Sequence, residues 1–267
     1  MSTSESKKVR RSDIFFAEKD KALRKDVHRL GELVGDLVKD QLGEVLFDLV
    51  EAVRRAAIES REGDTNEIDQ LDKLLSSLTP NNAGDFIRAF STYFQAVNMA
   101  EKVHRIRRRR AYLKDSDTPQ PLGFADTLRR LKANGVNGKT VEKVLGTLSV
   151  EPVFTAHPTE TTRRTLLRKQ QNIARYLIGM LDPYMTSGEE QAALDRIRTS
   201  MTAGWQTEEQ PAERMTVGDE VEQVLFFLTD VLYKMIPRFY EDFDDALEAS
   251  FKGEHIHVPI LVRFSSW

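Results

Sequence analysis

The sequence predicts a mainly α-helical protein in which an N-terminal helical region is followed by the first strands of a larger α/β barrel with long helical insertions. Apolar residues recur every three or four positions over most of the 267 residues, a spacing that is typical of amphipathic helices. Two short runs, VEPVFTAHP from residue 150 and HVPILVRFSSW from residue 257, are instead rich in β-branched and aromatic residues, as buried strands are. Together these segments predict a TIM-like barrel that has only begun by residue 267.

The N-terminal part is expected to be helical apart from its start. Residues 1–13 are polar and are predicted to form a disordered tail, followed by an N-terminal helical region over residues 14–113. Within this region the apolar spacing predicts one long helix from Leu23 to Val53 and a short one from Ile68 to Leu78. A third helix should begin at Asp85, because aspartate is a favoured N-cap residue.

Residues 114–149 are predicted to form a linker with short helices, because KDSDTPQPLG concentrates proline, aspartate and serine. The catalytic barrel is predicted to start within residues 150–267. Helices between its two strands are expected at residues 166–181, 189–201, 219–235 and 239–251, with Pro237 ending the third of them. A buried strand at the end of a chain leaves its backbone groups without partners, so we expect the chain to be truncated at residue 267.

Composition limits the classes of function. The chain has no cysteine, which excludes disulfides, thiolate zinc sites and cysteine nucleophiles, and a cytoplasmic location is expected. No apolar run approaches the roughly 18 residues of a membrane span, so no membrane partner is expected. The net charge of -3 argues against general nucleic-acid binding, which needs a basic surface.

His157 is the strongest catalytic candidate among the five histidines. Pro158 disfavours helical geometry at His157 and suits the start of the helix that follows. The histidine is therefore expected on the loop at the C-terminal end of a strand, where reacting groups lie in parallel α/β folds and barrels.

Arg163 and Arg164 fall in or near the first turn of this helix, which Thr159 is expected to cap. Cations at that end oppose the helix dipole and cost about 0.3–1 kcal/mol each. Because backbone N–H groups, the dipole and two guanidinium groups converge there, the arrangement predicts a site for phosphate or carboxylate. An imidazole beside such a site could move a proton on an anionic substrate.

The same residues have simpler interpretations. A histidine in a strand-to-helix loop is often a hydrogen-bonded structural residue, and arginine pairs on helices are commonly solvent-exposed. The residue pattern by itself leaves both alternatives open.

The segment VFTAHPTETTRRTLLRK is similar to the histidine signature of phosphoenolpyruvate carboxylases, V-L/F-T-A-H-P-T-E/Q followed by two arginines. Three further segments resemble that family in the same order. FSTYFQAVNMAEKVHRIRRRR resembles its N-terminal helix, WQTEE its tryptophan-containing motif, and PILVRFSSW the strand that leads into its GGDRDGN loop. The resemblance covers about residues 20–267 and implies the first third of a bacterial-type enzyme.

The resemblance implies a carboxylating carbon–carbon lyase that converts phosphoenolpyruvate and bicarbonate into oxaloacetate and phosphate with Mg²⁺ or Mn²⁺, feeding the tricarboxylic acid cycle. His157 would be its catalytic histidine, and Arg163 and Arg164 would support the substrate anion. The family's metal ligands lie in sequence beyond residue 267, so no metal ligand is expected in this chain. The isolated chain is expected to be inactive because the remaining groups of the site are missing. The full enzyme would be a homotetramer.

One departure from the family pattern follows the WQTEE motif. Many members have arginines there, whereas this chain has Gln210, Pro211 and Ala212. A basic contact expected at that place is therefore absent or displaced. The roles of Trp205 and Glu208 within the motif stay open, although a buried anchor is the commoner role of tryptophan.

Other functions compete with this one. The arginines within residues 105–110 could contact nucleic acid, but they lack interleaved aromatic residues and are expected to belong to the scaffold. A phosphotransfer histidine would lie inside a helix, which Pro158 disfavours at His157. The chain could also be a split or decayed paralogue that acts as a helical partner-binding protein. His255 and His257 could ligate a metal from a strand, but no third ligand is near in sequence and surface positions are expected.

Overall fold

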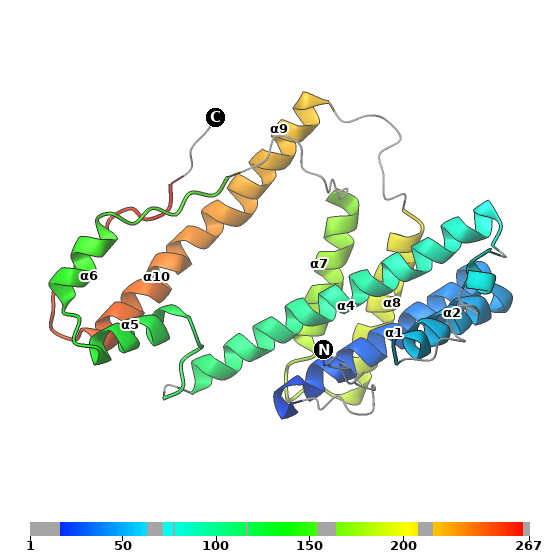
Figure 1. Cartoon of the computed structure of the whole chain (residues 1–267), viewed down its shortest axis with the longest axis horizontal. Coiled ribbons are helices and arrows are strands. Elements are labelled where there is room, and N and C mark those ends of the chain that lie inside the picture. Colours follow the sequence, from blue (N-terminus) through cyan, green and yellow to red (C-terminus); the bar gives the residue numbers. More distant parts are fainter. Residues whose placement is uncertain are drawn as a thin grey trace, which may run out of the picture. The chain divides into compact units, whose positions relative to one another are not determined.

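The computed structural model describes residues 17–62, 72–76, 78–115, 117–153, 164–207 and 216–263, and these are mainly α-helical (Figure 1). Its main helices are α1 (Lys21–Leu42), α2 (Glu44–Glu62), α4 (Pro80–Lys114), α5 (Phe124–Ala133), α6 (Gly138–Leu145), α7 (Arg164–Gly179), α8 (Ser187–Trp205), α9 (Val217–Phe226) and α10 (Tyr233–Ser250). A 3₁₀ turn, η2 (Glu18–Asp20), precedes α1, and a π-helical turn, η3 (Phe227–Leu232), joins α9 to α10. The prediction of a mainly α-helical chain is confirmed for this part.

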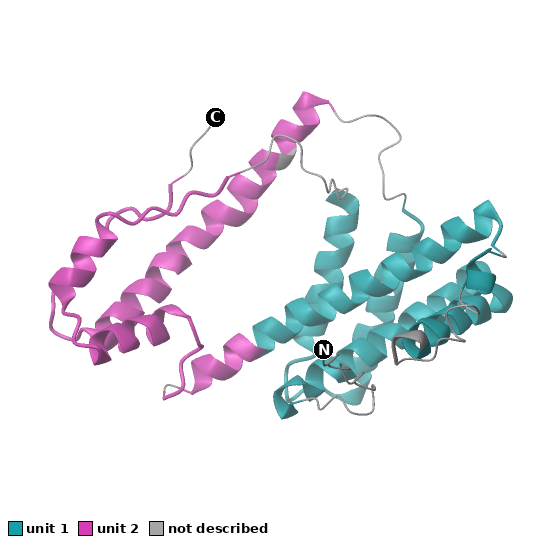
Figure 2. Ribbon diagram, viewed as in Figure 1, with its two compact units in different colours: residues 1–107, 164–208 teal, residues 108–163, 209–267 magenta. Residues whose placement is uncertain are grey.

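The chain forms two compact units, each built from two separate segments (Figure 2). Unit 1 comprises residues 1–107 and 164–208, and unit 2 comprises residues 108–163 and 209–267. The long helix α4 contributes its first part to unit 1 and its end to unit 2. The predicted tail over residues 1–13 lies outside the described residues, and the predicted domain boundaries stay predictions.

Unit 1 begins with two helices where the apolar spacing from Leu23 to Val53 predicted one. Helix α1 ends at Leu42 and α2 begins at Glu44. Between them Gly43 has a φ of 83°, a left-handed conformation that glycine adopts without steric cost. The prediction of one helix is wrong because periodicity reports which face is buried and not whether the backbone is continuous.

Helix α4 begins earlier than the predicted N-cap at Asp85. Its first residue is Pro80, a position that suits proline because an N–H there would have no helical partner. The Thr79 hydroxyl accepts a hydrogen bond from the Asn82 N–H at 3.3 Å and so caps the helix. The N-cap prediction for Asp85 is wrong, because Pro80 both ends the preceding segment and starts this helix.

The core of unit 1 lies between α1, α4, α7 and α8. Helix α7 buries Leu166, Ile173 and Leu177, so the helix predicted from this spacing is confirmed over its described part. Helix α8 begins with a capping box, in which Thr186 and Glu189 each accept a hydrogen bond from the other's backbone N–H. The buried residues of this core are Leu30, Val34, Leu37, Val38, Ala89, Ala96, Met99, Ala100, Val103, Ile173, Leu177, Ile197, Met201 and Trp205.

The core of unit 2 is centred on α10. Phe124, at the start of α5, packs edge-on against Phe239 and Phe243 of α10, with ring centroids 5.3 and 5.0 Å apart. Edge-to-face pairs of this kind add to the stabilisation that burial provides. The buried residues of this core are Leu128, Val141, Leu145, Phe243, Ala246, Leu247, Phe251 and Leu261.

Pro237 lies inside α10 and does not end a helix. A proline within a helix removes one hydrogen bond and costs about 3 kcal/mol, which is why the sequence predicted a stop there. The aromatic and aliphatic side chains that follow it, Phe243 and Leu247 among them, are buried in the core of unit 2. The stop prediction is wrong because this packing offsets the local cost.

The two predicted strand segments lie together in unit 2 but do not form extended strands in the described residues. They meet in one isolated parallel bridge between Val150 and Val262. Val150 and Val153 are 45% and 69% exposed, so the predicted burial of the first strand is wrong for its described part. A strand is buried by neighbours on both sides of its sheet, and a single bridge provides only one neighbour.

Candidate functional site

The predicted catalytic residues lie at the edge of the described part of the chain. His157, Arg163 and Thr159 fall within residues 154–163, outside the described residues. Arg164 is the first residue of α7 and is exposed. The structure therefore defines the supports on either side of the histidine motif, and the roles of His157, Arg163 and Arg164 stay predictions.

The support before the motif is the backbone pairing of Val150. Its N–H donates to the Leu261 carbonyl at 2.8 Å, and its carbonyl accepts the Arg263 N–H at 3.1 Å. Both bonds belong to one parallel bridge. Parallel pairing of neighbouring strands is the arrangement that an α/β barrel requires.

The partner segment is in turn fixed to α10. Leu261 is 1% exposed and lies in the core of unit 2. The Tyr240 hydroxyl accepts hydrogen bonds from the N–H groups of Leu261 at 2.7 Å and Val262 at 3.3 Å. Because Val262 also pairs with Val150, the tyrosine holds the bridge on the helix.

Glu254 ties the start of this segment to α5 and α6. Its carboxylate accepts a hydrogen bond from the Lys132 ammonium at 2.5 Å and another from the Gly138 N–H, the first of α6, at 2.6 Å. The Lys132 hydrogen bond and then the Gly138 N–H hold the pKa of Glu254 below its usual value. A Cβ added to Gly138 would lie 2.5 Å from the Glu254 carboxylate, so the carboxylate would have to move away from this N–H.

The arginines at the end of α4 mostly have partners within the chain. Arg107 forms an ion pair with Asp26 at 2.6 Å, and Arg109 forms one with Asp242. Arg108 donates to the Tyr112 hydroxyl at 2.5 Å. These contacts favour the predicted scaffold role over contact with nucleic acid.

Trp205 is a packing residue. Its side chain is 6% exposed in the core of unit 1, and the Arg88 guanidinium lies 5.2 Å from its ring centroid, a cation–π distance. This burial favours the anchor role among the alternatives that the sequence left open for Trp205. Glu208, Gln210, Pro211 and Ala212 lie outside the described residues.

His255 and His257 are exposed, as expected. Across the described ranges, no three His, Cys, Asp or Glu side chains are grouped in a way that could hold a metal ion. The part of the chain that the structure describes therefore does not fit the divalent cation that the resemblance implies. None of the described helices is both long and apolar enough to cross a membrane.

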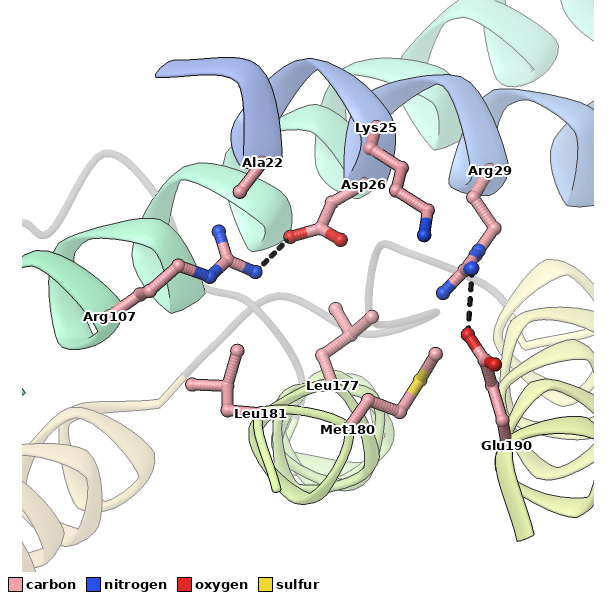
Figure 3. Close-up of a pocket in the computed structure, with 9 residues that line it drawn as sticks. All are labelled: Ala22, Lys25, Asp26, Arg29, Arg107, Leu177, Met180, Leu181 and Glu190. Atoms are coloured by element: carbon pink, nitrogen blue, oxygen red, sulfur yellow. Dashed lines mark hydrogen bonds and ion pairs between the residues drawn. The ribbon is translucent and has the colours of Figure 1, made fainter. Parts of the chain in front are cut away.

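A pocket of about 330 Å³ in unit 1 was not predicted from the sequence (Figure 3). It is lined by Ala22, Lys25, Asp26, Arg29, Arg107, Leu177, Met180, Leu181 and Glu190. Lys25 and Arg29 are four residues apart on α1, a spacing that places them on one face. The other lining residues come from distant parts of the sequence, which is why no local pattern indicated the pocket.

Comparison with known proteins gives one consistent result. The family model described as phosphoenolpyruvate carboxylase matches residues 23–267. The phosphoenolpyruvate carboxylase of Xanthomonas oryzae pv. oryzae is 48% identical over 258 residues, which are 96% of this chain and 28% of the relative. That of Burkholderia vietnamiensis is 36% identical over 252 residues, 94% of this chain and 25% of the relative. The chain thus spans only about a quarter of the length of these curated relatives.

Proposed function

The chain belongs to the phosphoenolpyruvate carboxylase family, and from this premise we propose that it supplies the N-terminal part of an enzyme that makes oxaloacetate and phosphate from phosphoenolpyruvate and bicarbonate. The observation that carries the proposal is the family match over residues 23–267. The histidine motif VFTAHPTETTRR lies inside that range. The proposed reaction takes place in the cytoplasm and feeds the tricarboxylic acid cycle, and the full enzyme is a homotetramer.

In this proposal His157 is the proton acceptor of the second half of the reaction. A bicarbonate oxygen first attacks the phosphorus of phosphoenolpyruvate, which releases the enolate and forms carboxyphosphate. His157 then takes the carboxyl proton as carboxyphosphate breaks down to CO₂ and phosphate, and the enolate carbon captures the CO₂. An imidazole suits this step because its ordinary pKa lies near neutral pH.

Arg163 and Arg164 would stabilise the anions on either side of that step. Both intermediates carry several negative charges, and guanidinium groups bind phosphate and carboxylate with paired hydrogen bonds. A position for these arginines at the C-terminal end of a barrel strand is supported by the Val150 to Val262 bridge, since parallel pairing is expected at the start of such a barrel. Arg164 begins α7, whose buried face is packed in unit 1, so its backbone has a firm support.

The divalent cation of the full enzyme, Mg²⁺ or Mn²⁺, would polarise the substrate oxygens. We propose that its ligands lie in sequence beyond residue 267, where the family resemblance places them. For the same reason the chain alone should give negligible turnover, because transition-state stabilisation needs all groups preorganised around one substrate.

A chimera tests the proposal. The matching segment of the Xanthomonas oryzae relative, 48% identical, is replaced by this chain, and bicarbonate-dependent oxaloacetate formation is followed by reduction of the product with NADH and malate dehydrogenase. The chimera should be active, and the isolated chain should not.

Within the chimera, His157→Asn should lower kcat by about 10²–10⁴-fold, the usual contribution of a general acid or base.

His255→Asn is the matched control, because His255 is exposed and outside the motif; it should leave kcat unchanged. A chimera that keeps full activity with His157→Asn would contradict the assigned role. A folded chimera with no activity, while the parent relative is active, would instead favour the alternative of a decayed, partner-binding paralogue.

A further inference from the structure

The pocket in unit 1 combines charged walls with an apolar floor. Its charged side chains come from α1, from α4 near its end and from the first turn of α8. Its floor is formed by Leu177 at the end of α7 and by Met180 and Leu181 in the turn that follows (Figure 3). All of its lining residues belong to unit 1, so its geometry does not depend on unit 2.

Both carboxylates of the pocket are already neutralised. Arg29 pairs with Glu190 at 2.7 Å, and Arg107 pairs with Asp26 at 2.6 Å. The Asp26 and Arg107 side chains are only 14% and 26% exposed, so water screens this pair less than a surface pair. Each arginine uses one terminal nitrogen in its ion pair, and the other terminal nitrogen of Arg107 lies 3.0 Å from His104 Nδ1. Because a guanidinium has five N–H donors in all, each arginine keeps donors for a ligand.

Lys25 supplies a positive charge that no carboxylate in the described residues balances. Its ammonium group points into the pocket between Asp26 and Arg29 (Figure 3). No ion pair joins it to a described aspartate or glutamate, although its neighbours Arg29 and Arg107 each have one. The described residues that line the pocket therefore carry one surplus positive charge, in a chain whose net charge is -3.

The floor of the pocket selects for an apolar body. Leu177 is 3% exposed and belongs to the core of unit 1, so it supports the floor from below, while Met180 and Leu181 are partly exposed and provide its accessible apolar surface. A ligand methylene placed on it would gain about 0.8 kcal/mol from burial. Inorganic phosphate would satisfy the cations but would leave this apolar surface uncovered.

We propose that this pocket binds a small aliphatic monocarboxylate, with the carboxylate held by Lys25 and the remaining donors of Arg29 and Arg107 and the aliphatic body resting on Met180 and Leu181. A volume of about 330 Å³ is at the small end of ligand sites, which suits a short chain. One carboxylate charge balances the one surplus cation. The proposal is independent of the proposed carboxylase function, since it involves neither His157 nor its motif.

The test uses the methyl group of Met180 as a reporter inside the pocket. The whole chain is labelled with ¹³C at its methionine methyl groups, and Met180→Leu identifies the signal. Hexanoate should shift that signal saturably, whereas hexan-1-ol, which has the same body without the charge, should not. Lys25→Gln should raise the Kd for hexanoate about tenfold or more, because a charge-assisted hydrogen bond is lost.

Lys102→Gln is the matched control, because Lys102 is exposed on α4 and does not line the pocket; it should leave the Kd unchanged. Circular dichroism of each variant checks that the helices are intact. The proposal is overturned if hexanoate gives no saturable shift, if Lys25→Gln binds as well as the parent chain, or if inorganic phosphate binds more tightly than hexanoate.

Discussion

Units 1 and 2 are both built on helices, but they bury their apolar side chains to different degrees. In unit 1, four helices enclose a core that includes Ile197 and Ala100, each 0% exposed. In unit 2, apolar side chains such as Val153 and Ile260 are 69% and 71% exposed on the two strand-like segments. Most of the large apolar side chains that are exposed in the described residues belong to unit 2.

The difference reflects how each kind of element satisfies its backbone. A helix pairs its N–H and C=O groups internally and needs only one partner for its apolar face. A strand needs a neighbour for its backbone and further elements for both of its faces. The helices of unit 1 pack around one shared core, whereas in the described residues of unit 2 the two strand-like segments are joined by a single bridge between Val150 and Val262.

The largest expected effect tests whether the two cores are separate. Phe251→Ala removes a side chain that is 1% exposed in unit 2 and should lower the free energy of unfolding by about 3–5 kcal/mol. Hydrogen exchange should then rise in α5, α6 and α10 but not in α1, α7 or α8. The mirror variant Ile197→Ala, costing about 2–5 kcal/mol, should raise exchange in unit 1 alone, and equal loosening of both units by either variant would contradict the comparison.

A smaller loss of stability is expected when a side chain is added at Gly138, next to Glu254. In Gly138→Ala the new Cβ would lie 2.5 Å from the carboxylate and 3.1 Å from Ile256, so the contact must open at a cost of about 1–3 kcal/mol. Urea unfolding measures the change. Gly188→Ala, near the start of α8 where a Cβ would meet nothing within 4 Å, should not destabilise; if it lowers stability as much as Gly138→Ala, crowding is not the cause.

Removal of the Tyr240 hydroxyl should loosen the bridge itself. Tyr240→Phe leaves the N–H groups of Leu261 and Val262 without the acceptor that they now have, at a cost of about 1–3 kcal/mol. Exchange of these two amides should accelerate while that of α10 stays slow. Tyr184→Phe, at a side chain that is 90% exposed, is the control, and unchanged exchange at residues 261 and 262 would remove Tyr240 as the support of the bridge.

The smallest effect should depend on pH. The pKa of the Glu254 carboxyl is lowered in the folded chain, first by the Lys132 hydrogen bond. Its stabilisation is therefore present above the unfolded pKa of about 4.3 and is lost as the pH falls through the folded pKa. Glu254→Gln should lower Tm near pH 7, and the difference from the parent chain should shrink as the pH falls through the folded pKa of Glu254.

Glu248→Gln, at an exposed position on α10, is the charge-matched control for this series. If the difference between the parent chain and Glu254→Gln were to grow as the pH falls, the carboxylate would not be the stabilising form.

The sequence correctly predicted the helices that depend only on the spacing of nearby apolar residues. The spacing of Leu166, Ile173 and Leu177 predicted the described part of α7, because one buried stripe is enough to define a helix. The break at Gly43 was missed because periodicity does not report whether the backbone is continuous. The continuity through Pro237 was missed because it depends on packing in the core of unit 2. The two strand-like segments meet only in the Val150 to Val262 bridge and form no extended strand in the described residues, because a strand depends on neighbours in a sheet that local sequence does not specify.

The two candidate sites also differ in whether the sequence alone could indicate them. The residues of the motif around His157 are contiguous along the chain, so the pattern of residue types is enough to indicate it. The pocket in unit 1 combines Lys25, Arg107 and Glu190, which only the fold brings together. Contiguous motifs are visible to sequence reasoning, whereas sites assembled from separate helices are not.

The π-helical turn η3 sets the angular phase of the long helix that it interrupts, which runs through α9 and α10 (Figure 1). A turn of this kind inserts about one residue and so rotates the preceding helix by roughly 100° relative to an unbroken one. Counted back from Phe243 with this insertion, the residues in line are Val224 and its neighbours one turn away, Val221 and Leu228. The aliphatic ridge of α9 thereby continues the ridge that α10 buries.

Without the insertion, the residue about five turns before Phe243 would be Leu225, flanked along the axis by Glu222 and Thr229. In a chain shortened by one residue within η3, the face of α9 in line with the buried face of α10 would therefore include polar residues. The one additional residue in η3 therefore aligns the apolar face of α9 with that of α10.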